Sequence, residues 1–520
     1  MIKYLNKSFL IFRLNLYLFR NFIFRIKIKN QIIPEKVIII KSFPIEYWIK
    51  FEILIADEFS ILGYNVFLII NRNNFDKYKS ISKFSNNIKF IFIDDYVCPT
   101  IKVKFKNLKK IEDIKYLFFN GLNIGRLIIS SIKNIVLTNK TEFDFNLRFK
   151  FNLLFNISIT YLNAYNKIID KYKPLKVFSV EKGDIGSGEL FEISVSKKID
   201  FIQYSSCHQP QSIIFKRYHL ENKDVHPFSV SDNSILKYNF KNIDFRNEII
   251  QYFHDGYINE KWFAYKKLIS GKISLTREEF CEKYNISPEH KNVVIFSHVL
   301  NDANLFYGND LFEGGFAEWL VETIKFASKI ENVNWIVKLH PANLFRNKNL
   351  GIKDENLEIS LIENEIGQIP NNILILTPDT NLNPYSFFKI TDVGITVRGT
   401  IGAELPCFGI PVITAGTGRY SGKGFTYDPK TKDEYFQFLS KVSKLNKLDD
   451  DTVILAQKHA YLFFKNRIFD YSTIFRDNIS TNSVLSEHTI DIVESNFRNT
   501  KVFKSMINFL LFDKNDDYLY

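Results

Sequence analysis

Short apolar runs of strand length alternate with longer amphipathic stretches along most of this 520-residue chain. KVIIIKS at 36–42 has a continuous apolar centre, IEYWIKFEILIADEFSIL at 45–62 has apolar residues at helical spacing, and YNVFLII at 64–70 is apolar again. Gly63 separates the last two stretches. A strand, a helix, a glycine stop and another strand form the βαβ unit of a parallel sheet, whose strands are apolar on both faces. We therefore predict an α/β fold.

This pattern occurs in two series. Further strands of the first series are predicted at 88–94, 174–180, 200–206 and 228–232, with a helix at 188–199. The second series is predicted to contain a helix at 316–330 and strands at 292–298, 334–341, 372–376, 392–397 and 410–416. Two series of similar size indicate two Rossmann-like domains that face each other across a cleft.

The division into domains follows from these series. We expect a basic segment at 1–30, a first Rossmann-like domain at 31–255, a second at 256–455, and C-terminal helices at 456–520. The charged and aromatic stretch 237–271 is predicted to form helices that link the two series. The C-terminal helices are expected to cross back or to dock on the surface.

The first thirty residues hold a large share of the positive charge. The formal net charge is +12, and residues 1–30 contain seven Lys and Arg residues and no acid. The longest uncharged run there, 14–19, is far shorter than the ~20 residues of a spanning helix, and no small-residue cleavage site follows an apolar core. The segment is predicted to be a basic amphipathic helix on an anionic membrane surface; the alternative is a helix packed on the protein itself.

Several common sites are excluded by the sequence. The four cysteines, Cys98, Cys207, Cys281 and Cys407, lie far apart without CxxC spacing, which predicts free thiols in a reducing compartment and no metal site. The chain has no GxGxxG, GxxxxGK[ST] or GxSxG motif. We assign its many aromatic residues to the core, and we expect no nucleic-acid partner.

The run VNWIVKLHP at 333–341 ends a predicted strand on His340 and Pro341. Proline cannot continue a strand ladder, so the chain must leave the sheet here. Ligands of open parallel sheets bind beyond the carboxyl ends of the strands. His340 is therefore placed either to contact a phosphate or to cap a backbone carbonyl.

The run TVRGTIGAELPCFGIPVI begins at Thr396 and follows another predicted strand. Gly399 ends that strand, and Thr400 is expected to cap a helix whose amides point toward a phosphate. Arg398 adds positive charge, and Glu404 is placed to bind a ribose diol. The alternative is a tight turn with a capping carboxylate at Glu404.

Two further loops of the second series carry candidate residues. Ser297 and His298 follow its first strand, and Arg419 lies in the glycine-rich stretch 416–427, which we expect to close over an anionic ligand. Together with Pro341, these residues complete the predicted nucleotide-binding set.

The first series offers carboxylates for acid–base chemistry. The loop VEKGDIGSGE at 180–189 contains Glu181, Asp184 and Glu189, and Asp94 and Asp95 form a rival pair. An acceptor hydroxyl needs a base within hydrogen-bond reach, whereas acids at loop starts more often cap helices. A further strand end, at His208 and Gln209, is a candidate for contact with the acceptor.

The segments FSHVLNDAN, WIVKLHP, DVGITVRGTIGAE and GIPVITAGTGRYSGKGF, in this order, resemble the nucleotide-binding half of bacterial capsule polysaccharide biosynthesis proteins. That group is similar to the Kdo transferases of capsule assembly, and the His-Pro motif is similar to that of bacterial polysialyltransferases. The resemblance covers about residues 290–440. It implies a GT-B fold and sugar transfer from a nucleotide-activated donor without a metal or other cofactor.

The resemblance also implies roles for individual residues. His340 would contact the donor phosphate, as in relatives that use CMP-sugars, and Gly399 and Thr400 would help to bind the nucleotide. Polysialyltransferases have an acidic-acidic-Gly base motif, whereas this chain has EKGD, so the catalytic base remains open between Glu181 and Asp184. The residues themselves do not distinguish CMP from UDP or GDP.

The resulting hypothesis is a glycosyltransferase on the cytoplasmic face of the plasma membrane. It would extend a capsule or other surface polysaccharide, with an oligosaccharide or glycolipid as acceptor. One alternative is a teichoic-acid-like polyol-phosphate transferase, although such enzymes carry Asp-Tyr-Ser-Ser where this chain has TVRGTIGAE. The other is a non-catalytic basic binding protein.

Overall fold

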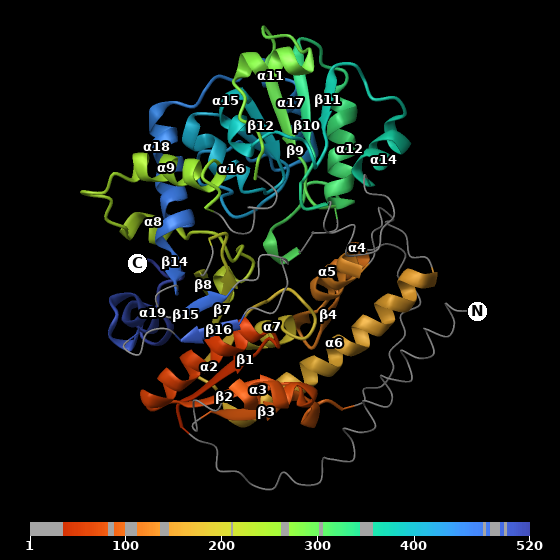
Figure 1. Ribbon diagram of the computed structural model, residues 1–520. Coiled ribbons are helices and arrows are strands. Elements are labelled where there is room, and N and C mark those ends of the chain that lie inside the picture. Colours follow the sequence, from red (N-terminus) through yellow and green to blue (C-terminus); the bar gives the residue numbers. More distant parts are fainter. Residues whose placement is uncertain are drawn as a thin grey trace.

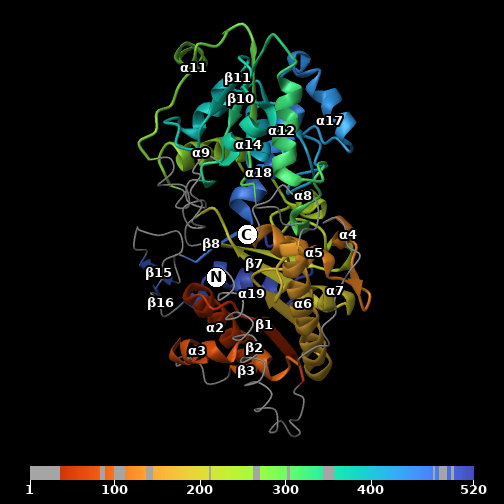
Figure 2. The same cartoon turned by 90° about the vertical axis from the view of Figure 1, so that its right-hand side faces the viewer.

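The chain folds into two α/β halves, one above the other in Figures 1 and 2. The structure is a computed structural model that describes residues 35–81, 88–98, 112–135, 145–209, 212–261, 270–300, 305–343, 357–471, 475–478, 489–492 and 497–520. The predicted basic segment 1–30 lies outside these residues. No helix within them is both long and apolar enough to cross a bilayer.

The first half is built on a seven-stranded sheet in the order β14-β8-β7-β6-β1-β2-β3. Its strands are β1 (Val37–Lys41), β2 (Asn65–Ile70), β3 (Lys89–Phe92), β6 (Lys176–Ser179), β7 (Asp200–Ser206), β8 (Ser212–Tyr218) and β14 (Ile468–Asp470). The strands from β3 to β7 are parallel, and β8 runs antiparallel to both of its neighbours. The strand order reverses between β1 and β6, so the loops after these two strands diverge there.

Helices cover both faces of this sheet. Those on one face are α2 (Glu46–Ile61), α3 (Phe75–Ile81) and α19 (Lys501–Leu511), and those on the other are α5 (Gly125–Ile135), α6 (Phe145–Tyr172) and α7 (Gly188–Ser196). Ile38 and Ile40 pack on the first face, whereas Val37 and Ile39 pack on the second. Gly63 follows α2 with a φ of +86°, a conformation that favours glycine and stops the helix as predicted.

The second half is a five-stranded parallel sheet in the order β11-β10-β9-β12-β13. Its strands are β9 (Lys291–Phe296), β10 (Val333–Lys338), β11 (Ile373–Leu376), β12 (Val393–Thr396) and β13 (Val412–Thr414). One face is covered by α12 (Gly315–Ala327), α14 (Leu357–Ile366) and α17 (Lys432–Leu439), and the other by α11 (Arg277–Tyr284) and α15 (Phe387–Ile390). The strand order reverses between β9 and β12.

The other α-helices and strands of the described residues lie outside the two sheets and the helices that cover them. They are α4 (Glu112–Lys115), β4 (Phe118–Phe119), β5 (Leu122–Asn123), α8 (Asp232–Lys237), α9 (Phe245–Tyr257), α16 (Ile401–Glu404), α18 (Asp450–Tyr461), β15 (Phe475–Asn478) and β16 (Thr489–Ile492). The predicted GT-B-like α/β architecture, with two Rossmann-like parallel-sheet halves, is confirmed.

Two details of the strand prediction are wrong. Residues 228–232 form a turn and the start of α8, not a strand, whereas Ser212–Tyr218 form the fully buried strand β8. The segment after residue 455 also contributes strands as well as helices, because β14 pairs with β8, Ile468 opposite Ile214. Pairing across so many residues leaves no local pattern in the sequence.

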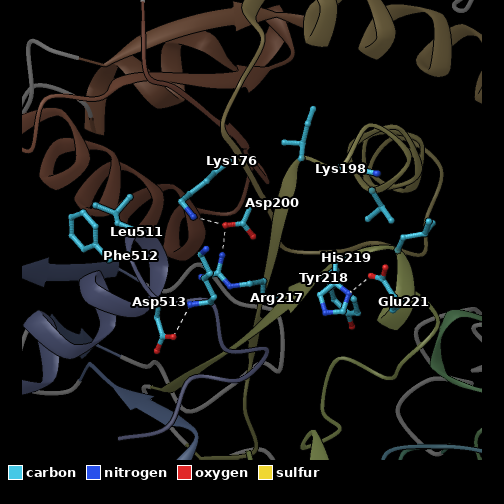
Figure 3. A pocket seen from close by; sticks show the side chains of 14 residues that line it. Lys176, Lys198, Asp200, Arg217, Tyr218, His219, Glu221, Leu511, Phe512 and Asp513 are labelled. Carbon is cyan, nitrogen blue, oxygen red and sulfur yellow. Dashed lines mark hydrogen bonds and ion pairs between the residues drawn. The ribbon is translucent and has the colours of Figure 1, made fainter. Parts of the chain in front are cut away.

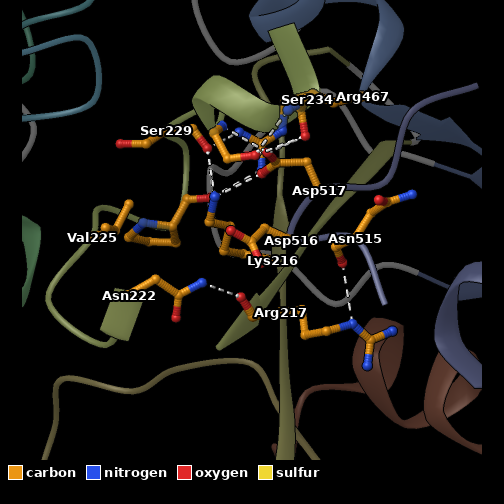
Figure 4. A network of polar contacts seen from close by, with 12 residues as sticks. Lys216, Arg217, Asn222, Val225, Ser229, Ser234, Arg467, Asn515, Asp516 and Asp517 are labelled. Carbon is orange, nitrogen blue, oxygen red and sulfur yellow. Dashed lines mark hydrogen bonds and ion pairs between the residues drawn. The ribbon is translucent and has the colours of Figure 1, made fainter. Parts of the chain in front are cut away.

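The C-terminal tail is attached to the first sheet through a buried ionic network (Figure 4). Asp517 accepts hydrogen bonds from the Lys216 ammonium at 2.8 Å, the Ser231 amide at 2.7 Å and the Ser234 hydroxyl at 2.9 Å. The Arg467 guanidinium lies 3.6 Å from the same carboxylate. Burial disfavours the charged acid, yet Lys216 and Arg467 hold the pKa of Asp517 well below its usual range.

Candidate functional site

A cavity of about 160 Å³ lies at the carboxyl ends of β9, β10 and β12. This is the edge at which the second sheet changes strand order, where open α/β sheets bind their ligands. Its lining includes Ser297 and His298 after β9, His340 and Pro341 after β10, and Gly399, Thr400 and Glu404 after β12. Seven of the sequence-predicted site residues thus come together around one cavity.

His340 is held in place by its own loop and by the neighbouring strand. Its amide donates to the Ser297 hydroxyl at 2.9 Å, and its Nδ1 accepts a hydrogen bond from the Ala342 amide at 3.1 Å. Nδ1 is therefore an acceptor, so the proton of the neutral ring lies on Nε2. The ring thus caps the Ala342 amide through Nδ1, and its Nε2–H is a hydrogen-bond donor.

Glu404 is a buried carboxyl in the wall of the cavity. Its Oε2 accepts a hydrogen bond from the Tyr257 hydroxyl at 2.8 Å, and Thr400 also contacts it through its side chain. Burial raises the pKa of Glu404 to about 7, while Tyr257, Thr400 and the Arg419 charge act in the opposite direction. The carboxyl can therefore donate or accept a hydrogen bond near neutral pH.

The helix expected after Thr400 is shorter than the sequence suggested. The α-helix α16 spans only Ile401–Glu404 and continues as a 3-10 turn, and the Thr400 side chain does not cap it. Gly399 lies in a close-packed turn, where a β-carbon would stand 3.0 Å from the Thr396 hydroxyl. The backbone is thus close to the cavity, but the helix is too short to act as an extended anion site.

His298 and Arg398 are engaged in contacts within the protein. Nε2 of His298 accepts a hydrogen bond from the Val397 amide at 3.1 Å. The imidazole ring stacks on Phe316, with 4.3 Å between the ring centres. Burial, followed by the nearby charges, lowers the pKa of His298 well below its usual value, so the ring is neutral. Arg398 pairs with Asp310 and does not line the cavity.

Arg419 lies where the second half meets the first. Its guanidinium carbon is 5.6 Å from the centre of the Phe228 ring. Burial is the main cause that lowers the pKa of His208 to about 3, and the charge of Arg419 acts in the same direction. The same charge acts on Glu404 and His298. Arg419 thus places a positive charge between the cavity and the first half.

Among the predicted carboxylates, Glu181 contacts the second half through a hydrogen bond. Its Oε1 accepts from the amides of Lys182 at 2.7 Å and Gly183 at 2.8 Å. Its Oε2 accepts from the hydroxyl of Tyr307 at 2.8 Å, and Tyr307 belongs to the loop that follows β9. The strand end of β6 is therefore connected to the strand end of β9.

Asp184 lies in the same loop, where its backbone carbonyl accepts from the amides of Ser187 and Gly188 at the start of α7. Asp94 accepts from the Arg72 amide at 2.6 Å, and Asp95 pairs with the Arg72 guanidinium. Those last two carboxylates follow β3, the outermost strand of the first sheet.

Glu189 is buried within the first half, and His208, which follows β7, is partly buried. Glu189 accepts from the Ser158 hydroxyl at 2.6 Å and the Gly186 amide at 2.7 Å, and burial raises its pKa to about 7. Nε2 of His208 contacts the Tyr252 hydroxyl of α9. Both side chains thus have structural partners.

Among the cavity residues that the sequence analysis did not single out are Tyr257, Lys272 and Lys338. Lys338 is 8% exposed, and burial, followed by the charge of Lys272, lowers its pKa to about 7. A charged residue at the end of an apolar strand, two positions before His340, was the available signal. Tyr257 and Lys272 approach from the linking segment, which only the tertiary structure brings to the sheet.

A second cavity, of about 520 Å³, lies at the amino ends of β6 and β7 (Figure 3). Lys176 and Arg217 both pair with Asp200 there, and His219 pairs with Glu221. Lys176, Arg217 and Asp200 are thus engaged with one another, and the cavity lies at the amino ends of strands in the first sheet, whereas the predicted site residues follow carboxyl ends. Within the described residues, no group of three or more His, Cys, Asp or Glu could hold a metal ion, and the four cysteines are free thiols.

No family model and no curated protein matches the chain. Among solved structures, Thermosulfurimonas dismutans KpsC, beta Kdo 2,4 transferase, is similar with 13% identity, over 55% of this chain and 79% of that one, at a TM-score of 0.34. UDP-GlcNAc 2-epimerase from Neisseria meningitidis bound to UDP-GlcNAc is similar with 10% identity, over 82% of this chain and 95% of that one, at a TM-score of 0.27. Spinosyn rhamnosyltransferase SpnG is similar with 10% identity, over 82% of this chain and 95% of that one, at a TM-score of 0.25. All three TM-scores are low.

Proposed function

We propose that the chain is a glycosyltransferase that binds a nucleotide-activated sugar, with a CMP-sugar favoured, in the cavity at the carboxyl ends of β9, β10 and β12. The acceptor would be a growing capsule or other surface polysaccharide at the cytoplasmic membrane face. The observation that carries the proposal is the convergence of His340, Thr400 and Glu404 on one cavity at the point where the strand order reverses.

In this proposal His340 stabilises the leaving phosphate. As the bond between the sugar and the phosphate breaks, negative charge grows on the phosphate oxygens. The Nε2–H donor of His340 is oriented by its Nδ1 contact and is placed to bind that charge more strongly in the transition state than in the ground state. Glu404 would hold the ribose diol, with Tyr257 fixing its carboxyl.

Glu181 is proposed as the base that accepts the proton of the acceptor hydroxyl. The amides of Lys182 and Gly183 and the hydroxyl of Tyr307 fix its carboxylate at the edge facing the second half. A general base must lie within hydrogen-bond reach of the hydroxyl whose proton it accepts. The reaction needs no metal in this scheme.

The first test replaces the proposed phosphate ligand. His340→Ala is expected to fold normally and to lose sugar transfer by about 10²–10³-fold in kcat, because one preorganised donor to the developing charge is removed. His290→Ala is the matched control, since His290 lies at the amino end of the same sheet, directly before β9. Transfer at the wild-type rate by His340→Ala would contradict the mechanism.

A second test separates the two candidate bases. Glu181→Gln is expected to lower kcat by about 10²–10⁴-fold with little change in KM for the donor, because only the proton acceptor is lost. Asp184→Asn, in the same loop, should retain most activity. The opposite ranking in a transfer assay with both variants would assign the base to Asp184.

A further inference from the structure

Two lysines line one end of the same cavity, and neither forms an ion pair within the described part of the chain. Lys338 is the last residue of β10, and Lys272 lies beside the loop after β11, where Ile273 bridges to Leu382. In that loop the hydroxyl of Thr377 donates to Asp379 at 2.5 Å. Both lysines line the cavity, whereas Asp379 does not.

The hydrogen bonds of Lys338 account for two of the three donors of its ammonium group. Its Nζ donates to the carbonyls of Leu339 at 2.8 Å and of Thr377 at 3.4 Å. An ammonium group has three N–H donors, so the third needs an acceptor. None is present among the described residues, and the side chain is almost fully buried.

The charges around Lys338 act in both directions. Burial is the main cause that lowers its pKa to about 7, and the Lys272 ammonium acts in the same direction, whereas Asp379 and Glu358 oppose them. The pKa of Lys272 is also lowered by its partial burial, with Asp379 again opposing. Two neighbouring cations in a confined space repel each other, and an anion that binds between them reduces this repulsion.

His340 extends this group of donors. It lies two residues beyond Lys338, and the Leu339 amide still bonds to the Leu376 carbonyl, so the chain remains extended between them. Residues two apart on an extended strand lie about 7 Å apart on the same side. Lys338 and His340 can thus bind two different oxyanions of one ligand.

We infer that Lys338 and Lys272 bind a second oxyanion of the donor, next to the phosphate that contacts His340. This rests on the proposed function and restricts the donor to molecules with two anionic groups. The second group is either the second phosphate of a nucleoside diphosphate sugar or the carboxylate of a sugar acid linked to a nucleoside monophosphate. Both present the same oxyanion to the two lysines.

Calorimetry on the full chain with ligands of graded charge tests this inference. The ligands are cytidine and uridine, CMP and UMP, CDP and UDP, a CMP-linked sugar acid, and inorganic pyrophosphate. We expect CDP, UDP or the CMP-linked sugar acid to bind at least tenfold more tightly than CMP or UMP. Whether the gain comes from the second phosphate or from the carboxylate identifies the source of the second oxyanion.

Variants of the two lysines test whether that gain in affinity comes from Lys338 and Lys272. Lys338→Met and Lys272→Met should each remove about tenfold in affinity for the doubly charged ligand, and leave nucleoside affinity within about twofold, because each removes one charge-assisted hydrogen bond. Lys389→Met, an exposed lysine on α15 outside the cavity lining, changes the net charge equally and should have no effect. Lys272→Met keeps the test valid if Lys338→Met fails to fold.

The dependence on pH provides a second readout. Above pH 7 the second phosphate ionisation, with a pKa of about 6, is complete, so the ligand charge is constant. Binding of the doubly charged nucleotide should weaken from pH 7 to pH 9 as Lys338 loses its proton, and this slope should be absent in Lys338→Met. Wild-type affinity and slope in both lysine variants would overturn the inference.

The outcomes also distinguish this inference from the proposed function. If the lysine variants bind and transfer like the wild type, the second oxyanion site is wrong and the transferase proposal stands. If no nucleotide binds, but pyrophosphate binds and loses about tenfold in both lysine variants, the oxyanion site stands and the nucleotide donor is wrong.

Discussion

At the scale of single residues, the buried carboxyls give the protein a specific dependence on pH. Glu52 of α2 is fully buried and accepts from the Tyr204 hydroxyl at 2.6 Å and from the Ser42 hydroxyl. Burial raises its pKa from 4.5 to about 8, although these hydrogen bonds oppose the shift. Between these two pH values the folded chain holds a proton that the unfolded chain has released, so the free energy of unfolding falls as pH rises.

Glu52→Gln tests this dependence. The wild type should lose up to ~1.4 kcal/mol of unfolding free energy per pH unit through Glu52 between about pH 5 and 8, and the variant should lack this contribution. Urea denaturation of both proteins across this range measures the difference. Glu363→Gln, on the exposed side of α14, is the control and should keep the wild-type slope. Parallel curves for Glu52→Gln and the wild type would contradict the assignment.

At the scale of elements, the C-terminal tail completes the first half. Strand β14 pairs with β8, and α19 packs in the same core as α2. Asp517, on the tail beyond α19, neutralises Lys216 of β8 and lies 3.6 Å from Arg467, directly before β14 (Figure 4). The contact between Lys216 and Asp517 joins residues 301 positions apart in the sequence.

Asp517→Ala should therefore cost about 3–5 kcal/mol of unfolding free energy, because Lys216 and Arg467 are left as buried cations without their acid. Asp516→Ala is the neighbouring control. The Asp516 side chain pairs with the half-exposed His219 at 3.2 Å, so its loss should cost less than about 1 kcal/mol. Equal costs in chemical denaturation would show that the network is not a major source of stability.

At the scale of the whole molecule, the positive charge is unevenly distributed along the chain. Residues 1–30 supply seven of the surplus positive charges, and we propose that they bind an anionic membrane surface. The full chain should co-sediment with anionic vesicles at low salt and be released at about 0.5 M salt, because screening weakens the attraction. Neutral vesicles are the control. Unchanged binding after deletion of residues 1–30 would contradict the proposal.

Much of the fold was predictable because its signals are local. Runs such as VVIF in β9 and WIV in β10 are apolar on both faces, and this property identifies central parallel strands whatever lies around them. Strands that depend on distant partners were not predictable. Strand β8 was missed, and β14 consists of only three residues whose partner lies more than two hundred positions earlier.

The sequence alone determined the α/β class, the two series of strands, and the placement of His340, Thr400 and Glu404 after strands. The reason is that strand ends and glycine or proline breaks are encoded over a few neighbouring residues. It did not decide which candidates face the cavity, because side-chain partners come from distant segments.

Only the tertiary structure showed that Arg398 is paired with Asp310 and that Tyr307 joins Glu181 to the second half. The same holds for Lys272, which the linking segment brings beside Lys338. Burial, charge pairing and hydrogen-bond satisfaction depend on contacts between residues far apart in the chain, so these properties arise only when the whole chain has folded.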